Sequence, residues 1–321
     1  MDVLSKREVC LIMAEIAKKL RSSDQLKYRR RTTALTLRLM VLPGLVMILL
    51  FIVYPIVRSI ILSFDTWPGV GSATFVGLQN YRTLFANPDF WVSLRNNLVI
   101  CVVTTLFSIA LGTTFAAAIH RNVPGARLFK VAYFLPYIIP AIIVTVFWEL
   151  AFQPTGGIVN TLLGALHLGS NYVWLGSPNA ALFVVIFVNI WFQAGFCMIF
   201  VLAAMDGIPP EIEAAARLDG VNAFQNFFSI LVPISREVLV TIAMLEMLFS
   251  FRQFTVVWGL TQGGPGTATS VLDVLLYKQA FIFTNFGLGS AIAVVSTVVV
   301  GLMALLFIVV FRPAAITTGE G

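Results

Sequence analysis

The sequence predicts an all-α integral membrane protein with about six transmembrane helices. Of its 321 residues, 59% are hydrophobic and only 11% are charged, whereas a soluble domain carries about 25% charged residues. The apolar residues gather in long runs, and a helical crossing of the hydrocarbon core needs about 20 of them. A third observation, the uneven distribution of Lys and Arg between alternate loops, gives the orientation.

Six apolar segments are expected to cross the membrane. They are 38–64, 96–119, 131–152, 179–205, 237–260 and 286–311. Each must be helical, because an unpaired backbone amide in lipid costs several kcal/mol, and none shows the alternating pattern of a barrel strand. Pro136 and Pro140 are two points at which the third segment can break.

The positive charges place both chain ends in the cytoplasm. Ten of the 21 Lys and Arg residues lie within the first 38 residues, opposed by four acidic residues. With the N-terminus inside, sixteen cations fall on the inner side and only three in the outer loops. Cytoplasmic segments carry this excess in membrane proteins, so the predicted orientation is N-in and C-in.

Three regions follow from this topology. Residues 1–37 form a basic cytoplasmic extension, 38–312 the transmembrane domain and 313–321 a cytoplasmic tail. The extension contains an apolar stripe at helical spacing, and this amphipathic helix lies either in the headgroup region or against a partner subunit. The charge is explained by topology, so lipid and not nucleic acid is the expected partner. The spacing of Cys and His residues predicts no metal site.

The inner loop 206–236 carries the most information about function. Pro209 and Pro210 can open a helix, Glu211 in its first turn suits the helix dipole, and Gly220 can end it. A second short helix follows, so the cytoplasmic face presents a helical hairpin that a motor subunit can push. The expected coupling residues are Glu211, Glu213, Ala214, Ala215, Ala216, Asp219 and Gly220.

This loop resembles the EAA loop of bacterial ABC importer permeases, in which Glu-Ala-Ala leads to Asp-Gly and then to Ile-x-Leu-Pro. The matching residues are Ala215, Ala216, Asp219, Gly220, Ile230 and Pro233. Segments 75–82, 134–136 and 261–266 are similar to the maltose and glycerol-phosphate type of permease. The loop departs at Glu213, one residue before the usual glutamate position. One residue is about 100° on a helix, which argues against a fixed salt bridge from Glu213 to an ATPase.

The resemblance implies a type I ABC importer permease in the bacterial cytoplasmic (inner) membrane. Such a chain pairs with a second homologous permease, sits on two ATPase subunits and receives a sugar from a periplasmic or surface-anchored solute-binding protein. The sequence has no GxxxxGK[ST] phosphate loop and no nucleophile–base pair. The chain is therefore expected to be non-catalytic and to bind no cofactor, with ATP and Mg²⁺ held by the partner subunits.

Polar residues within the fourth and fifth segments are candidates for the substrate pathway. They are Asn189, Trp191, Gln193, Glu246, Ser250, Arg252 and Gln253. Amides, a guanidinium and an aromatic face suit a sugar, but the same amides can bond helix to helix. Glu246 and Arg252 are about 600° apart on a helix, so no salt bridge between them is expected.

Arg252 also bears on the substrate, because a guanidinium binds a carboxylate or phosphate well. An acidic oligosaccharide such as an alginate-like uronate, a phosphorylated polyol and a neutral disaccharide all remain open. The main alternative function is an ion-coupled secondary sugar transporter, which commonly shows inverted repeats. The sequence shows no such repeat, and it lacks the catalytic residues of a membrane enzyme.

Overall fold

The computed structural model describes residues 40–120 and 124–311. The predicted basic extension over 1–37 and the tail over 313–321 lie outside these residues. The chain divides into two compact units, Met1–Ser59 and Ile60–Gly321, which are described separately.

The described part of the first unit belongs to the first predicted span. One helix runs over Met40–Leu62 and contains the π-helical turn η1 (Leu49–Val53) and the helix α2 (Tyr54–Leu62). Large apolar side chains are exposed along it from Met40 to Val57. An apolar surface of this kind suits a helix that faces lipid or other helices.

The second unit begins with the last residues of this helix, from Ile60, and continues in a short segment outside the predicted spans. The strands β1 (Asp65–Thr66) and β2 (Thr74–Phe75) pair antiparallel, and the helix α3 (Gln79–Ala86) follows. The Nδ2 of Asn80 donates to the carbonyl oxygens of Ser63 and Asp65, both at 2.9 Å. This buried amide therefore fixes α3 against the chain that leads into β1.

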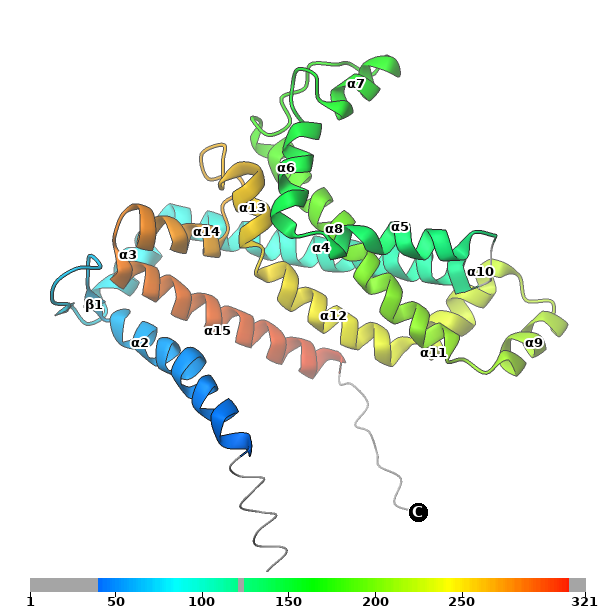
Figure 1. Cartoon of the computed structure of the whole chain (residues 1–321), viewed down its shortest axis with the longest axis horizontal. Coiled ribbons are helices and arrows are strands. Elements are labelled where there is room, and N and C mark those ends of the chain that lie inside the picture. The colour runs from blue at the N-terminus through cyan, green and yellow to red at the C-terminus, as the bar shows by residue number, and fades with distance from the viewer. Residues whose placement is uncertain (1–39, 121–123, 312–321) are drawn as a thin grey trace, which may run out of the picture. The chain divides into compact units, whose positions relative to one another are not determined.

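The helices α4 (Pro88–His120) and α8 (Pro178–Asp206) form the centre of this unit and pack along much of their length (Figure 1). Gly112 of α4 permits the close approach, because a Cβ there would lie 2.5 Å from the Cβ of Cys197. The helix α5 (Ala126–Ile138) packs on α8 at Gly195, where a Cβ would overlap the carbonyl of Tyr133. Small residues at helix contacts are typical of membrane proteins.

Two of the predicted spans are broken. The third divides into α5 and α6 (Ala141–Ala151), which are bent by 99°. Pro140 lies at this break after Ile139, whose backbone is extended, whereas Pro136 is accommodated inside α5. A proline removes one helical hydrogen bond and restricts the residue before it, which accounts for the break at Ile139–Pro140.

The prediction of one continuous helix over 237–260 is wrong. The helix α12 (Arg236–Phe251) ends at Arg252, and α13 (Phe254–Thr261) starts after Gln253. Both linking residues have non-helical backbones. The break turns α13 onto α6 and buries Val256, Val257 and Leu260, so tertiary packing overrides the apolar run.

The remaining elements are short apart from the last. They are α7 (Ile158–Ala165), α9 (Pro210–Leu218), α10 (Ala223–Asn226), η2 (Phe227–Leu231), α11 (Val232–Ile234), α14 (Leu272–Tyr277), η3 (Lys278–Ile282) and α15 (Phe286–Phe311). Many large side chains in the second half of α15 are exposed and apolar, as in a helix surrounded by lipid.

Within the described residues, four single helices have the length and composition of a membrane span. They are Met40–Leu62, Pro88–His120, Pro178–Asp206 and Phe286–Phe311. Two bent pairs, Ala126–Ile138 with Ala141–Ala151 and Ala223–Ile234 with Arg236–Phe251, raise the number to six if each pair is one span. The prediction of about six spans agrees with this range.

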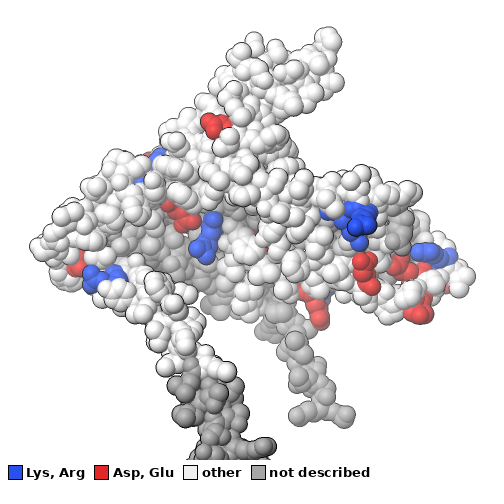
Figure 2. All heavy atoms as spheres, viewed as in Figure 1, with Lys and Arg blue, Asp and Glu red and all other residues white. Residues whose placement is uncertain are grey.

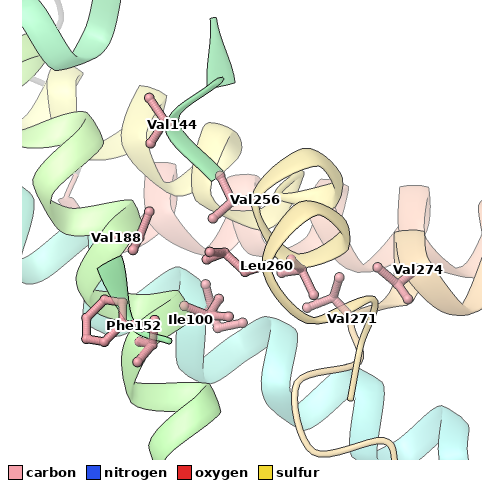
Figure 3. Close-up of a cluster of buried hydrophobic side chains, with 11 residues drawn as sticks. Ile100, Val144, Phe152, Val188, Val256, Leu260, Val271 and Val274 are labelled. Atoms are coloured by element: carbon pink, nitrogen blue, oxygen red, sulfur yellow. The ribbon is translucent and has the colours of Figure 1, made fainter. Parts of the chain in front are cut away.

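Buried apolar side chains form three clusters in the second unit. One gathers residues of α4, α6, α8, α13 and α14, including Ile100, Val144, Val188 and Leu260 (Figure 3). A second joins the C-terminal ends of α4 and α8 to Leu231 and Ile242. The third lies among α3, α4, α12, α14 and α15. The second cluster places the inner loop directly against the ends of two long helices.

Candidate functional site

The inner loop folds as its local sequence predicts. Pro209 precedes α9, Pro210 is its first residue, and the helix ends at Leu218. Gly220 follows with a φ of 76°, a left-handed conformation that glycine adopts without strain. Asn222 and Gln225 then form a capping box at the start of α10. The predicted sequence of helix, glycine turn and second helix is confirmed.

The two faces of α9 differ in exposure. Seven of its nine residues, at positions 210–212, 214, 215, 217 and 218, are exposed, and Leu218 is 90% exposed. Among them, positions 211, 214, 215 and 218 share one face, because residues three and four apart are neighbours on a helix. Glu213 and Ala216 lie on the opposite face, with the Glu213 side chain 12% exposed and Ala216 8% exposed. Asp219 and Gly220 follow the helix and are exposed.

A histidine connects α9 to the two central helices. The Nδ1 of His120, the last residue of α4, lies 2.8 Å from Asp206 Oδ1 at the end of α8. The Nε2 of the same ring lies 2.7 Å from Glu213 Oε1 of α9. Glu213 Oε2 lies 3.8 Å from Arg217 Nη2. Glu213 therefore turns toward the transmembrane helices, which its early position on the helix explains.

His120 was not among the predicted site residues, because its partners do not stand at helical spacing along the chain. Asp206 and Glu213 are 86 and 93 residues away along the chain. One signal was present in the sequence: the histidine and Asp206 each stand at the inner end of a predicted span. Inner ends of spans lie at one level of the membrane, so these side chains can meet.

A cavity of about 240 Å³ lies between α9 and α10. It is lined by Glu213, Ala216, Arg217, Val221, Ala223 and Asn226. The Oδ1 of Asn226 is buried and has no hydrogen-bond partner among the described residues. Charged side chains of both signs gather at the end of the molecule formed by α9, whereas most of the surface seen in the same view is uncharged (Figure 2).

Three of the predicted pathway residues meet at a second cavity of about 340 Å³. Its lining consists of Tyr137, Ala141, Phe192, Gln193, Phe249, Arg252, Gln253, Thr255 and Val256. Tyr137 lies 5.7 Å from Phe192 and 4.9 Å from Phe196 between ring centroids. The cavity thus combines an amide, a guanidinium and aromatic rings, the set expected for a sugar. The aromatic members were not predicted.

Arg252 is exposed at this cavity and has an acidic neighbour within electrostatic range, Asp273 of α14. Burial raises the pKa of the Asp273 carboxyl, and the positive charge of Arg252 opposes that rise. Arg252 and Asp273 form no ion pair within 4.0 Å among the described residues.

The other predicted pathway residues lie elsewhere. Asn189 is buried and donates to the Val185 carbonyl oxygen at 2.8 Å. Ser250 is buried and accepts a hydrogen bond of 3.3 Å from Gln193 Nε2, so it supports one residue of the cavity. Trp191 lines a separate, apolar cavity of about 310 Å³.

Glu246 is fully buried in α12, and neither carboxylate oxygen has a hydrogen-bond partner among the described residues. An ion pair between Glu246 and Arg252 is not found among the described residues either.

Comparison with known proteins gives the family context of these two sites. Residues 108–316 match the family described as binding-protein-dependent transport system inner membrane component. The chain is 33% identical to the probable ABC transporter permease protein PH1215 of Pyrococcus horikoshii, over 80% of this chain and 89% of that protein. It is 29% identical to the trehalose/maltose transport system permease protein MalF of Thermococcus litoralis, over 90% and 97%.

The fold is similar to that of a solved structure. A chain of a bacterial ABC transporter that imports the acidic polysaccharide alginate superposes with a TM-score of 0.79, at 21% identity, over 90% of this chain and 99% of that chain. The predicted type I importer permease fold is confirmed by this match.

Proposed function

The chain belongs to the family of binding-protein-dependent transport system inner membrane components, and from this premise we propose that it forms half of a membrane pathway for a sugar. It is a multi-pass inner membrane protein and a permease component of an ABC importer. The sugar substrate is supported by the similarity to the trehalose/maltose permease. The aromatic and polar lining of the larger cavity at Arg252 also supports it.

The proposal assigns the energy source to other subunits. Two ATPase subunits bind ATP and Mg²⁺, and one of them engages the exposed face of α9, while a second homologous permease completes the pathway. A periplasmic or surface-anchored solute-binding protein delivers the sugar. This chain supplies shape and binding groups and holds no cofactor of its own. The observation that carries this role is α9 itself, a short exposed helix fixed to the ends of two spanning helices.

We propose that Gln193, Arg252 and Gln253 contact the sugar, with Tyr137 and Phe249 as stacking faces. Asn189, Ser250 and Glu246 are buried between helices and act on the pathway through packing. Trp191 lines the separate apolar cavity. An acidic or phosphorylated sugar would use Arg252 most fully, and a neutral disaccharide would use the amides and rings.

Reconstitution in lipid vesicles tests the function. The chain would be co-expressed with a second permease, an ATPase and a solute-binding protein from the same organism, and the purified complex would be assayed for sugar uptake. Uptake that requires ATP and the loaded binding protein is the expected result. Uptake by this chain alone, driven by a proton or sodium gradient, would contradict the proposal and favour the ion-coupled carrier. The relatives reported above are named as permeases of an ABC transporter or of a transport system and give that alternative no support.

A further inference from the structure

His120 joins three elements at one point on the cytoplasmic side. Its ring contacts Asp206 at the end of α8 and Glu213 in α9, and its own backbone ends α4. The side chains of His120 and Glu213 are each only 12% exposed, so water competes little for this contact. Asp206 is 51% exposed and closes the bridge from the solvent side.

The two contacts together define the protonation state of the ring. A neutral imidazole carries one N–H and one acceptor nitrogen, whereas an imidazolium carries two N–H donors. Ionised carboxylates only accept, and both lie within hydrogen-bond distance of a ring nitrogen. Both bonds therefore form only when His120 is an imidazolium. The charged groups facing this bridge are Asp206 from α8, Glu213 from α9 and Arg217, which contacts Glu213 at 3.8 Å.

Few other side-chain contacts fix α9. Among the described residues, the hydrogen bonds and ion pairs from α9 side chains to the transmembrane helices are those of Glu213. Ala216 adds one buried methyl group, and the other residues of α9 apart from Glu213 are exposed. A movement of α9 therefore reaches α4 and α8 through the chain itself or through His120.

We propose that His120, as an imidazolium, is a positioning residue that transmits the displacement of α9 to the inner ends of α4 and α8. The inference rests on the proposed function, in which partner ATPases move α9. Charge-assisted hydrogen bonds are short and strong, so a doubly bonded ring holds the helix in one orientation. Without this bridge α9 still binds its partner, but the turns that contain Gly207 and Gly220 take up its movement.

The test uses His120→Asn and His120→Arg in the complete reconstituted transporter. Asparagine can replace one donor but cannot span both carboxylates, whereas arginine keeps the positive charge and several donors. His167→Asn is the matched control, because His167 lies outside the inner loop and has a φ of 55°, which asparagine tolerates.

For His120→Asn, we expect the ATPase subunits to co-purify at the wild-type ratio while the sugar transported per ATP hydrolysed falls. The expected fall is on the order of tenfold, within the usual range for coupling between two sites. His120→Arg should recover most of this ratio, and His167→Asn should not change it.

The pH profile separates transmission from simple support of the fold. Between about pH 6 and about pH 9, which brackets the ordinary imidazole pKa of about 6.5, transport per ATP by the wild type should decline as the ring loses its second N–H. In His120→Arg, transport per ATP should stay constant over the same pH range.

Three results would overturn the inference while leaving the proposed function intact. These are a wild-type transport ratio in His120→Asn, loss of the ATPase from that complex, and equal pH profiles for wild type and His120→Arg. A wild-type complex whose ATP hydrolysis ignores the binding protein would instead contradict the proposed function, and the inference with it.

Discussion

At the scale of single residues, Arg252 owes its position to the end of α12. In a continuous helix its side chain would lie on a different face from that of Glu246, six residues earlier. Because the backbone leaves the helix at Arg252, the guanidinium reaches the cavity beside Gln253. Asp273 lies close enough to act on it electrostatically, without forming an ion pair within 4.0 Å.

Arg252→Ala should weaken transport of an acidic sugar much more than transport of a neutral one. Loss of a charged hydrogen bond costs about 1.5–3 kcal/mol, so the expected rise in KM for a uronate oligosaccharide is on the order of tenfold or more. Transport by the reconstituted complex, measured with a uronate and a neutral disaccharide side by side, checks this. Arg252→Lys is the control for charge without the planar fork.

Equal KM values for wild type and Arg252→Ala with the uronate would show that Arg252 does not contact the substrate. A selective loss for the neutral sugar would contradict the charge argument as well. ATPase co-purification, measured on the same preparations, separates both results from a failure of assembly.

At the scale of elements, α9 shows which features a sequence can predict. Pro210 and Gly220 act through local backbone geometry, so the start and the end of the helix were readable from the sequence. The inward orientation of Glu213 depends on His120 and Asp206, which come from other elements. Local signals do not carry that information.

Cysteine cross-linking tests the outward face of α9. Ala215 is exposed and Ala216, the next residue, is buried. In a chain whose three cysteines are replaced by alanine, Ala215→Cys should capture an ATPase subunit with a short bifunctional reagent, and Ala216→Cys should not. The product is identified by mass on a denaturing gel. Capture at equal yield from both positions would mean that the exposed face is not the docking face.

Close helix packing makes a second prediction at this scale. A Cβ at Gly195 would overlap the backbone of Tyr133 in α5, whereas Gly301 in α15 has no atom within 4 Å of such a Cβ. Gly195→Ala should therefore destabilise the protein by about 1–3 kcal/mol through overpacking. Gly301→Ala should be neutral or stabilising by up to about 1 kcal/mol, because alanine favours a helix.

Thermal unfolding of the two glycine variants in detergent measures this difference against wild type. A lower midpoint for Gly301→Ala than for Gly195→Ala would contradict the packing described for α5 and α8. It would also remove the explanation given for the close approach of these helices.

At the scale of the whole molecule, hydrophobicity predicted the number of crossings better than their continuity. The apolar runs identify the segments because lipid imposes one strong condition on every residue of a span. The break at Pro140 had a local signal, whereas the break at Arg252 did not. The second break depends on α13 burying Val257 and Leu260 against α6. That gain arises only in the assembled structure.

The candidate sites divide in the same way. The residue types of the pathway were predictable, but the membership of one cavity was not. Gln193 and Arg252 line it, while Trp191 lines another and Glu246 lies buried between helices. Which face of a helix meets a cavity depends on its rotation against neighbours, and near-uniform apolar helices carry little signal of that rotation.

Membrane orientation gives the last prediction. Sixteen cations on the inner side against three on the outer require the loop that holds α9 to be cytoplasmic. In a cysteine-free chain, Asn171→Cys should react with a membrane-impermeant maleimide in cells whose inner membrane is intact and whose outer layers have been permeabilised. Arg127→Cys should react only after the inner membrane is permeabilised. Both residues are exposed, so a difference in labelling reports the side of the membrane. The reverse pattern would place α9 outside, where no nucleotide-hydrolysing partner could reach it, and the coupling role would fail with the orientation.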